Sequence, residues 1–543
     1  MLSLDNLNKT ERMKTNHPYT LFIILLLFSL SFTSCKTEPA VENIAIADDF
    51  SFEKLTVTQL KKMYTDGTYT IEQVTQKYLD HIDAIENEGP KLNSIIQVNP
   101  DAIAIAQQLD QELKDGKSRG ALHGIPIIIK DNIDTHDNMF TTAGSRALEG
   151  SQPLKDSFVA KKLKEAGAII IAKANLSEWA NFRGEMSSSG WSGINGQTKN
   201  PYILDRNPCG SSAGSGAAVS AGLSLIAIGT ETNGSIVCPS NANGVVGIKP
   251  TVGLISRSGI IPISFTQDTA GPMARTLTDA VLCLNALTGV DSTDTKTLAS
   301  VDNIQKDYTK FLKTDGLTGK KIGIFTGPLG RNYKVDTIFN QAVAYIQSQG
   351  AEVVEIDRIT ENSVGGLSFQ VMLYEYKDGL NNYFKSLGPN AKIKNLEELI
   401  AFNKKDSIEM EFYNQRYLEM ALEKEDLDSD GYKNTLKEML KGSRENGIDK
   451  VMGEHQLDAI IAPTGGPAWK TDHTNGDAFG LGSSSPAARA GYPNITVPMG
   501  FVGELPINIS FFGRAWSEPI LLEMAYAYEQ GTMKRKAPKF LEH

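Results

Sequence analysis

Residues 209–251 read CGSSAGSGAAVSAGLSLIAIGTETNGSIVCPSNANGVVGIKPT, which is two serine-rich clusters joined by small and apolar residues. The apolar run 223–228 has the composition of a buried strand, and Thr-Asn-Gly-Ser follows shortly after it at 232–235. Dense Gly and Ser cost conformational entropy on folding, so packing alone does not account for these clusters. A hydroxyl placed after a buried strand lies at the edge of a sheet, where it can face a ligand. We therefore take Ser235 as the candidate nucleophile.

Strand patterns alternate with helical patterns through the rest of the chain. Residues 124–129 (GIPIII) form a continuous apolar run that ends at Lys130, which is typical of a strand covered on both faces. A capping box at Thr70 and Gln73 predicts the start of a helix. Another helix is expected over 156–166, and further strands over 168–172, 321–325, 351–356, 459–462, 495–497 and 507–511. We predict an α/β fold with a mixed central β-sheet covered by helices on both faces.

Length and charge limit the classes of partner. A chain of 543 residues with 41% hydrophobic composition can bury a large core. Its 54 basic and 64 acidic side chains give a net charge of −10, and no basic block stands out, so nucleic acid is not an expected partner. The seven histidines are scattered and the cysteines lack metal-ligand spacing, so we expect neither a metal nor a cofactor.

A charged helical region, about 362–456, interrupts the strands. It contains Asp426, Asp428 and Asp430, which resemble the start of a calcium loop, but Lys437 occupies the position where a bidentate glutamate is needed. A polar turn between two helices is the simpler interpretation. The region is either a lid or a partly separate subdomain, and the sequence does not choose between them.

The amino terminus has the pattern of a targeting segment. Basic residues precede the apolar run 21–32, which is too short to span a bilayer comfortably, and small residues lead into Cys35. This pattern resembles a bacterial lipoprotein signal; a plain cleaved signal or a membrane anchor are the alternatives. We expect a signal peptide over 1–34, lipidation of Cys35, a tether over 35–50 and a catalytic domain over 51–543. The expected location is the bacterial cell envelope, on the periplasmic side or at the cell surface.

Four cysteines are present in the chain. Without Cys35 an odd number remains, namely Cys209, Cys238 and Cys283, in Gly/Ser-rich or apolar surroundings. We predict that these three are free, partly buried thiols.

One motif offers a different nucleophile. Residues 210–214 match G-x-S-x-G, the nucleophile elbow of α/β-hydrolases, which would make Ser212 the nucleophile and His473 a candidate base. The elbow requires a strand before the motif, whereas Asp205 to Cys209 have the composition of a turn. The elbow also leaves the second serine cluster without a role.

The two serine clusters together resemble the amidase signature family, and most closely its bacterial peptide amidases. The resemblance rests on GSSAGSGAAVSAG and GTETNGSIVCPSNANGVVGIKPT, with a lysine at a strand end upstream. It continues through 253–257 and 267–275, returns at 490–493 and 497–500, and covers most of the chain after about residue 51.

The resemblance implies a Ser-Ser-Lys triad on Ser235, Ser211 and Lys130. Ser235 would attack the amide carbonyl, Ser211 would relay a proton after a cis peptide bond, and Lys130 would be the base. A base needs a free lone pair, so Lys130 must be neutral, which burial can achieve. The backbone N–H groups of residues 232–235, with Thr232, Asn233 and Gly234 the principal candidates, would form the oxyanion hole.

The implied substrate is a small-molecule or peptide amide. By analogy, residues 182–195 would line the pocket, with Ser187, Ser189 and Trp191 as candidate contacts, although a surface loop would have the same composition. Asn233 stands where the peptide amidases have Asp, which puts a carboxylate contact with the substrate in doubt.

The peptide amidase branch implies release of ammonia from C-terminal peptide amides or amino-acid amides. Rival interpretations are an esterase that uses Ser212 with His473, a component of a transamidase for charged tRNA, and a non-catalytic surface lipoprotein that binds ligands. The export pattern argues against the transamidase component, which needs cytosolic partners. The complete set of two serines and a lysine argues against the non-catalytic protein.

Overall fold

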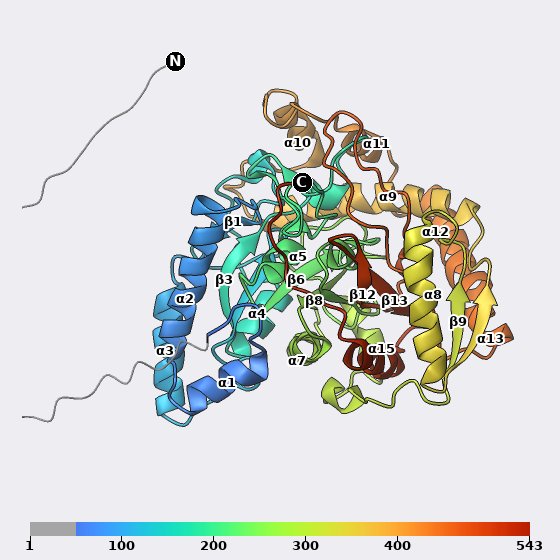
Figure 1. Ribbon diagram of the computed structural model, residues 1–543. Helices are drawn as coiled ribbons and strands as arrows, with labels where there is room; N and C mark the ends of the chain where they lie inside the picture. The colour runs from blue at the N-terminus through green and yellow to red at the C-terminus, as the bar shows by residue number, and fades with distance from the viewer. Residues whose placement is uncertain (1–49) are drawn as a thin grey trace, which may run out of the picture. The chain divides into compact units, whose positions relative to one another are not determined.

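A mixed sheet of eleven strands runs through the computed structural model, which describes residues 50–543 (Figure 1). The predicted signal peptide, Cys35 and residues 35–49 of the predicted tether lie outside the described residues. The described residues form one compact unit. In spatial order the strands are β1 (Ile95–Val98), β3 (Ile169–Ala174), β2 (Pro126–Lys130), β6 (Ile226–Glu231), β8 (Thr269–Ala274), β7 (Val246–Lys249), β12 (Asn494–Val502), β13 (Leu505–Phe512), β11 (Ala459–Pro463), β9 (Lys321–Phe325) and β10 (Glu352–Ile356). The predicted fold class is confirmed.

The candidate site lies at the ends of two parallel neighbours in this sheet. Strand β2 pairs in parallel with β3 on one side and with β6 on the other, with Ile129 opposite Ile228. All residues of β2, β3 and β6 are buried, as the continuous apolar runs predict for strands covered on both faces. Because the pair is parallel, the carboxyl ends of β2 and β6 meet at the same edge and bring Lys130 close to the start of the Ser235 turn.

Strand β8 was not predicted, although it lies in the middle of the sheet. Its sequence, TAGPMA, contains Gly271 and Pro272, which weaken or interrupt strand patterns. Pro272 nevertheless sits opposite Ile228, and a Cβ at Gly271 would lie 1.9 Å from the Ile248 carbonyl oxygen. The tertiary packing of β8 between β6 and β7 therefore overrides its poor strand propensity.

Two short helices pack closely on one face of the central strands. They are α5 (Ala213–Ser220) and α6 (Val237–Ala242), which begin directly after Ser212 and shortly after Ser235. Glycines on the strands leave room for them: a Cβ at Gly229 would lie 2.8 Å from Ser212 Oγ, and one at Gly247 only 2.3 Å from Ser240 Oγ. The small residues of the decisive stretch therefore allow both serine-bearing turns to approach the sheet.

Other helices cover the rest of the sheet on both faces (Figure 1). The capping box predicted at Thr70 is present, with mutual hydrogen bonds between Thr70 and Gln73 at the start of α2. The predicted helix over 156–166 is also confirmed, as α4. The covering helices are α1 (Val57–Thr65), α2 (Ile71–Asp83), α3 (Ala102–Lys114), α4 (Phe158–Glu165), α7 (Leu277–Leu287), α8 (Tyr333–Ser348), α14 (Ser485–Ala490) and α15 (Glu518–Thr532).

Helices fill the region between β10 and β11. They are α9 (Ser363–Ser386), α10 (Leu396–Asn403), α11 (Arg416–Leu422), α12 (Asp430–Ser443) and α13 (Asp449–Glu454). Ser429 caps α12 by accepting a hydrogen bond from Tyr432 N at 3.3 Å. Of the aspartates that resemble a calcium loop, Asp426 and Asp428 therefore lie in the turn between α11 and α12, and Asp430 begins α12. Within the described residues, no group of three or more His, Cys, Asp or Glu side chains is placed to hold a metal ion.

This helical region packs against the segments that follow β2 and β3. Its apolar side chains share a buried cluster with residues 143–148 and 179–182. Glu375 of α9 is fully buried and accepts hydrogen bonds from Thr266 N at 3.1 Å and from Tyr432 Oη at 2.7 Å. Buried polar contacts of this kind fix the relative position of the two parts.

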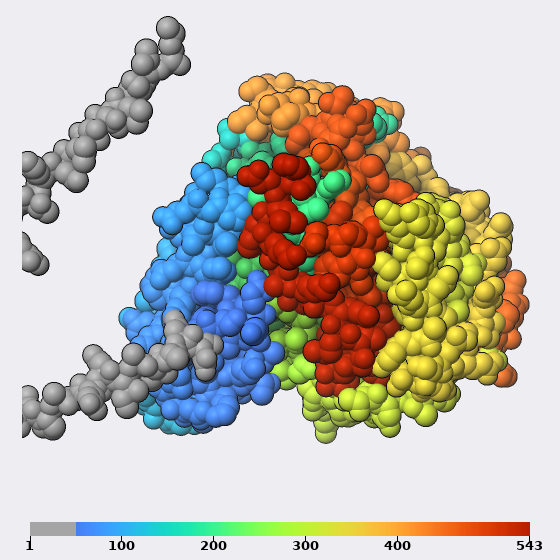
Figure 2. Space-filling view, in the orientation of Figure 1, coloured from blue at the N-terminus to red at the C-terminus, as the bar shows by residue number. Residues whose placement is uncertain are grey.

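The C-terminal segment crosses the surface in the direction of the amino-terminal helices (Figure 2). Leu204 N donates to Leu541 O at 2.7 Å, and Phe540 N donates to Pro201 O at 2.9 Å. The segment after α15 is thereby fastened to the loop that precedes Cys209. Among residues 50–543, no helix combines the length and apolar character needed to cross a bilayer.

Candidate active site

Lys130 ends strand β2 and points its ammonium nitrogen at the serine turns. Its Nζ lies 2.7 Å from Ser211 Oγ, 2.8 Å from Thr230 Oγ1 and 3.3 Å from Thr230 O. The side chain is completely buried. Burial lowers the pKa of Lys130 to about 7, although the carboxylates of Asp268 and Glu231 act in the opposite direction. An amine with this pKa is largely neutral at mildly alkaline pH and can accept a proton.

Ser211 follows a cis peptide bond, as the family resemblance implied. The bond joins Gly210 to Ser211, and Cys209 before it has a positive φ of 56°. A side chain at Gly210 would displace Ser177, because a Cβ there would lie 2.2 Å from Ser177 Oγ. Ser177 N also donates to Ser211 O at 3.0 Å. The turn therefore presents the Ser211 hydroxyl to Lys130 while its backbone rests on the segment after β3.

Ser235 lies on a short turn between β6 and α6, next to the Ser211 turn. Ser212 N donates to Ser235 O at 3.1 Å, so the two turns are directly hydrogen-bonded. Ser235 is 8% exposed, whereas Ser211 is 1% exposed, so Ser235 has more contact with solvent. Gly234 has a φ of 88°, a conformation that favours glycine. Ser235, the predicted nucleophile, is thus the more solvent-accessible of the two serines.

The turn that carries Ser235 has free backbone donors. Within residues 50–543, the N–H groups of Thr232, Asn233, Gly234 and Ser235 form no hydrogen bond. Buried backbone N–H groups are nearly always paired, so a run of unpaired donors beside a hydroxyl is unusual. Such donors can stabilise an oxyanion that forms next to Ser235. The oxyanion role of these residues stays a prediction.

Two carboxylates shape this turn from behind. Glu231 Oε2 accepts hydrogen bonds from Ile236 N at 2.8 Å and Val237 N at 3.0 Å, at the start of α6. Asp268 Oδ1 accepts from Thr232 Oγ1 at 2.5 Å, and burial raises the pKa of Asp268 to about 6. Asp268 was not identified from the sequence, because its contact with the turn depends on the unpredicted strand β8.

Thr230 is a further contact of Lys130 that was not predicted. Its hydroxyl lies within hydrogen-bond distance of Lys130 Nζ and also accepts from Asn132 Nδ2 at 3.0 Å. The signal was present in the sequence: once β2 and β6 are placed side by side in parallel, the threonine near the end of β6 must lie beside the lysine that ends β2. The pairing itself was the missing step.

The predicted substrate-binding residues differ in their hydrogen bonds and in their burial. Ser187 Oγ donates to Asn181 Oδ1 at 3.1 Å, and Ser189 is buried against Asp477, which accepts from Ser189 N at 3.0 Å and from Ser189 Oγ at 2.5 Å. Trp191 is 4% exposed and packs edge-on against Tyr413. A Cβ at Gly210 would lie 3.2 Å from Ser189 Cβ, so this group adjoins the Ser211 turn, and we call Ser189, Trp191 and Asp477 the wall. Contact of the wall with substrate stays a prediction.

The segment between β11 and α14 lies against the Ser235 turn. Ser484 Oγ donates to Asn233 Oδ1 at 2.8 Å, and Asn233 Nδ2 donates to Ser485 Oγ at 3.2 Å. The same segment contributes Asp477, whose carboxylate also accepts from Trp469 Nε1 at 3.1 Å. Asn233 therefore holds this segment in place, and its amide serves both as acceptor and as donor.

The alternative elbow nucleophile has no catalytic surroundings. Ser212 is fully buried, and its hydroxyl donates to Thr230 O at 3.1 Å and accepts from Thr230 N at 3.2 Å. His473 is hydrogen-bonded to Tyr413 Oη and stacks on Phe412. No hydrogen bond links Ser212 to His473 in the part of the chain that the structure describes. No strand leads into the motif either, so the structure does not favour the elbow interpretation.

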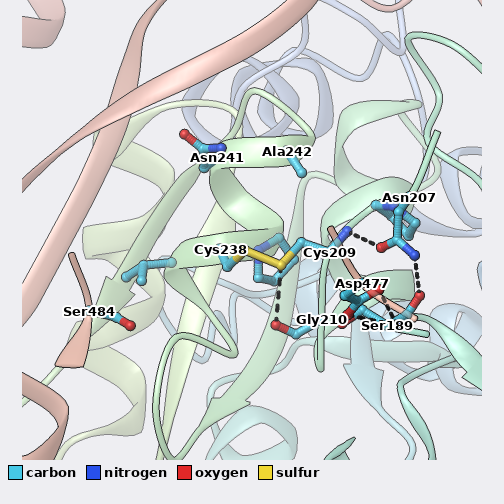
Figure 3. The surroundings of a disulfide bond; sticks show 12 residues. Ser189, Asn207, Cys209, Gly210, Cys238, Asn241, Ala242, Asp477 and Ser484 are labelled. Atoms are coloured by element: carbon cyan, nitrogen blue, oxygen red, sulfur yellow. Dashed lines mark hydrogen bonds between the residues drawn. A yellow bond between two sulfur atoms is a disulfide. The ribbon is translucent and has the colours of Figure 1, made fainter. Parts of the chain in front are cut away.

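The prediction of free thiols is wrong for two of the cysteines. Cys209 and Cys238 form a disulfide with their Cα atoms 5.9 Å apart (Figure 3). Cys283 is a buried free thiol. The odd count concealed this pair, because parity reveals nothing about which two side chains the fold brings together. The two cysteines meet because the turns that carry Ser211 and Ser235 lie side by side.

Comparison with known proteins agrees with this geometry. Residues 73–522 match the Amidase family. A probable amidase of Arabidopsis thaliana is 38% identical over 526 residues, which cover 95% of this chain and 97% of that relative. The A subunit of a glutamyl-tRNA(Gln) amidotransferase from a Cyanothece species is 33% identical over 497 residues, which cover 88% of this chain and 98% of that relative.

A solved structure shows the same architecture. The peptide amidase from Stenotrophomonas maltophilia superimposes with a TM-score of 0.86 at 45% sequence identity, covering 90% of this chain and 99% of that one. The family match spans most of the chain, and the relatives match it over nearly their whole length. The chain therefore belongs to the amidase family and is an amide-hydrolysing enzyme.

Proposed function

We propose that this enzyme hydrolyses the carboxamide of C-terminally amidated peptides or amino-acid amides and releases ammonia. The observation that carries the proposal is the buried Lys130 Nζ, 2.7 Å from Ser211 Oγ, beside a serine turn with unpaired N–H donors. The similarity to the peptide amidase of Stenotrophomonas maltophilia, at 45% identity, supports this substrate class.

The proposed reaction begins with proton transfer between the three side chains. Lys130 accepts the proton of Ser211 as Ser211 accepts that of Ser235, and Ser235 Oγ attacks the carbonyl carbon. The N–H groups of residues 232–235 stabilise the resulting oxyanion. The proton returns through Ser211 to the departing nitrogen, so ammonia leaves and an acyl-Ser235 ester remains. Water then attacks this ester by the same relay and releases the carboxylate.

A direct assay tests the proposal. Purified full-length protein is incubated with amidated peptides and with matched free acids and methyl esters; ammonia is measured enzymatically, and ester cleavage is followed by chromatography of the free acid. We expect ammonia from the amides only, and none from the Ser235→Ala variant. Hydrolysis of the esters alone, with every amide inert, would overturn the proposal.

We also propose that the enzyme works in the cell envelope, anchored by a lipid on Cys35. The pattern of basic, apolar and small residues before Cys35 supports this. So does the disulfide between Cys209 and Cys238, because such bonds persist mainly in oxidising compartments. Metabolic labelling with an alkyne fatty acid should mark the wild type and leave Cys35→Ser unlabelled. A wild-type protein that carries no label in the envelope fraction would contradict the anchor.

A further inference from the structure

The disulfide joins the two turns that carry the serines. Cys209 directly precedes the Gly210–Ser211 peptide bond, and Cys238 lies in the first turn of α6, after Ser235. Cys238 N donates to Gly234 O at 2.7 Å, so this cysteine is hydrogen-bonded to the residue before Ser235. The bond therefore spans from one serine turn to the other.

Cys209 is also tied to the wall of the site. Its backbone N–H donates to Asn207 Oδ1 at 2.8 Å, and Asn207 Nδ2 donates to Ser189 O at 2.8 Å (Figure 3). The dashed lines in Figure 3 run from Cys209 through Asn207 to Ser189 and on to Asp477. A displacement of Cys209 would therefore move both the Ser211 hydroxyl and the wall.

Non-covalent contacts would keep the region folded without the bond. Ser212 N donates to Ser235 O, and Asn243 Nδ2 donates to Pro208 O at 2.9 Å. A buried apolar cluster surrounds the two sulfur atoms; it contains Tyr202, Ile203, Ala242, Ala468 and Leu505. Loss of the bond therefore frees the serine turns over a short range and leaves the sheet and helices intact.

We propose that the Cys209–Cys238 disulfide positions Ser211 against Ser235 for proton transfer, so that the enzyme is fully active only when this bond is oxidised. The inference rests on the proposed function, because it assigns the bond a role in the serine relay. Proton transfer requires heavy atoms within hydrogen-bond distance, and a misplacement of about 1 Å can lower a rate about 100-fold. An export route to an oxidising compartment would then switch the enzyme on.

The redox step is a simple exchange with a dithiol. A dithiol thiolate attacks one sulfur of the protein disulfide, the S–S bond breaks, and a mixed disulfide forms. The second dithiol sulfur then displaces the protein, so the reagent is oxidised to a cyclic disulfide and Cys209 and Cys238 become thiols. Both cysteines are largely buried, at 4% and 7% exposure, so reduction of the folded protein is expected to be slow.

The test compares oxidised, reduced and re-oxidised enzyme. Purified protein is treated with dithiothreitol, and alkylation followed by mass spectrometry counts the free thiols. kcat and KM are then measured for an amidated peptide, together with the rate at which a fluorophosphonate labels Ser235. We expect kcat and the labelling rate to fall about 10- to 100-fold, KM to stay within about twofold, and re-oxidation to restore both rates.

Cysteine-to-alanine variants test the same inference without a reductant. Cys209→Ala, Cys238→Ala and the double variant should show the loss in kcat in the absence of dithiothreitol, with circular dichroism spectra like those of the wild type. Cys283→Ala is the matched control, because Cys283 is a buried free thiol in α7 and its removal should leave kcat unchanged. If the double variant does not fold, the comparison of reduced and oxidised wild type decides.

Two results would overturn the inference. One is unchanged kcat and labelling after verified loss of the disulfide; the other is a rise in KM that accounts for the whole loss of kcat/KM. Failure of the proposed function looks different: the oxidised wild type would label with fluorophosphonate but hydrolyse no amide. In that case the labelling rates alone still decide whether the disulfide positions the serines.

Discussion

Glu231 Oε2 lies 2.8 Å from the backbone nitrogen of Ile236, so this carboxylate closes the turn that carries Ser235 from strand end to helix start. It accepts from Val237 N as well, at 3.0 Å, and thus caps α6. Carboxylates at this position satisfy free N–H groups and favour the positive end of a helix. Glu231 therefore holds the turn without using the N–H groups of Thr232 to Ser235, which are the predicted oxyanion donors.

Replacing Glu231 with glutamine should disturb this support. The amide keeps one acceptor but buries an NH₂ group that has no partner, which typically costs about 1–3 kcal/mol of stability. We expect a lower midpoint of urea unfolding and a fall in kcat of about tenfold. Glu529→Gln is a useful control, because Glu529 is a buried carboxyl that accepts from Leu277 N, away from the serine turn. Equal loss of kcat in both variants would contradict a specific role for Glu231.

The pH dependence of the rate should report Lys130. The base works when it is neutral, and burial lowers the pKa of Lys130 to about 7. kcat/KM for a peptide amide should therefore rise about tenfold per pH unit below this value and level off above it. Lys130→Arg should be inactive at every pH, since a guanidinium stays protonated. A rate that is flat between pH 5 and 8 would exclude Lys130 as the base.

Asp268 should set the pH range over which kcat/KM rises, which we call the pH limb. Its carboxylate raises the pKa of Lys130, against the dominant effect of burial. Asp268→Asn removes the negative charge, so the limb should move to lower pH, and kcat should fall because Thr232 and the Ile263 N–H lose an ionised acceptor. Asp279→Asn, which alters a buried carboxyl at the start of α7, should leave the limb where it is. A limb unmoved in Asp268→Asn would refute the electrostatic account.

The two candidate nucleophiles can be separated by alanine substitution. Ser235→Ala and Ser211→Ala should each lower kcat by about 10⁴-fold or more. Ser212→Ala removes two hydrogen bonds to Thr230, so it should cost about 1–3 kcal/mol of stability while retaining most activity. His473→Ala should change kcat by less than about threefold. Steady-state kinetics with a peptide amide distinguish these outcomes, and an inactive His473→Ala would revive the elbow hydrolase.

Asp477 should act on substrate binding more than on chemistry. Its carboxylate holds Ser189 and Trp469, which belong to two different segments of the wall. Asp477→Asn loses the ionised acceptor, so the wall loosens and KM should rise about tenfold with a smaller change in kcat. Asp472→Asn, which alters a half-buried carboxylate on the same segment, is the matched control and should behave like the wild type. A pure kcat effect in Asp477→Asn would contradict this assignment.

Much of the fold and part of the candidate site could be predicted from the sequence. Continuous apolar runs such as 126–129 predict buried strands reliably, because strands covered on both faces need apolar residues at every position. Strand β8 could not be found in this way, since Pro272 and Gly271 oppose the strand pattern and only the neighbouring strands stabilise it.

The residues of the candidate site also divide into those that local sequence predicts and those that depend on distant segments. Ser235 was singled out from its local sequence, and the resemblance to the amidase signature family then implied Ser211 and Lys130. Thr230, Asp268 and the Cys209–Cys238 pair depend on which distant segments lie side by side, and a single sequence does not record this. Hydrophobic patterning specifies which face of an element is buried, but not its neighbour.

The strand order has a consequence for how the chain reaches its folded state. Strand β7 lies between β8 and β12 in the sheet. Strand β8 belongs to the half that adjoins the serine turns, whereas β12 begins only at Asn494. Until the last part of the chain emerges, β7 is an open edge with unpaired N–H and C=O groups, which invites pairing with other chains. Long-range pairing of this kind also slows folding. Chains cut short before Asn494 should therefore aggregate even though every serine and lysine of the candidate site is already present.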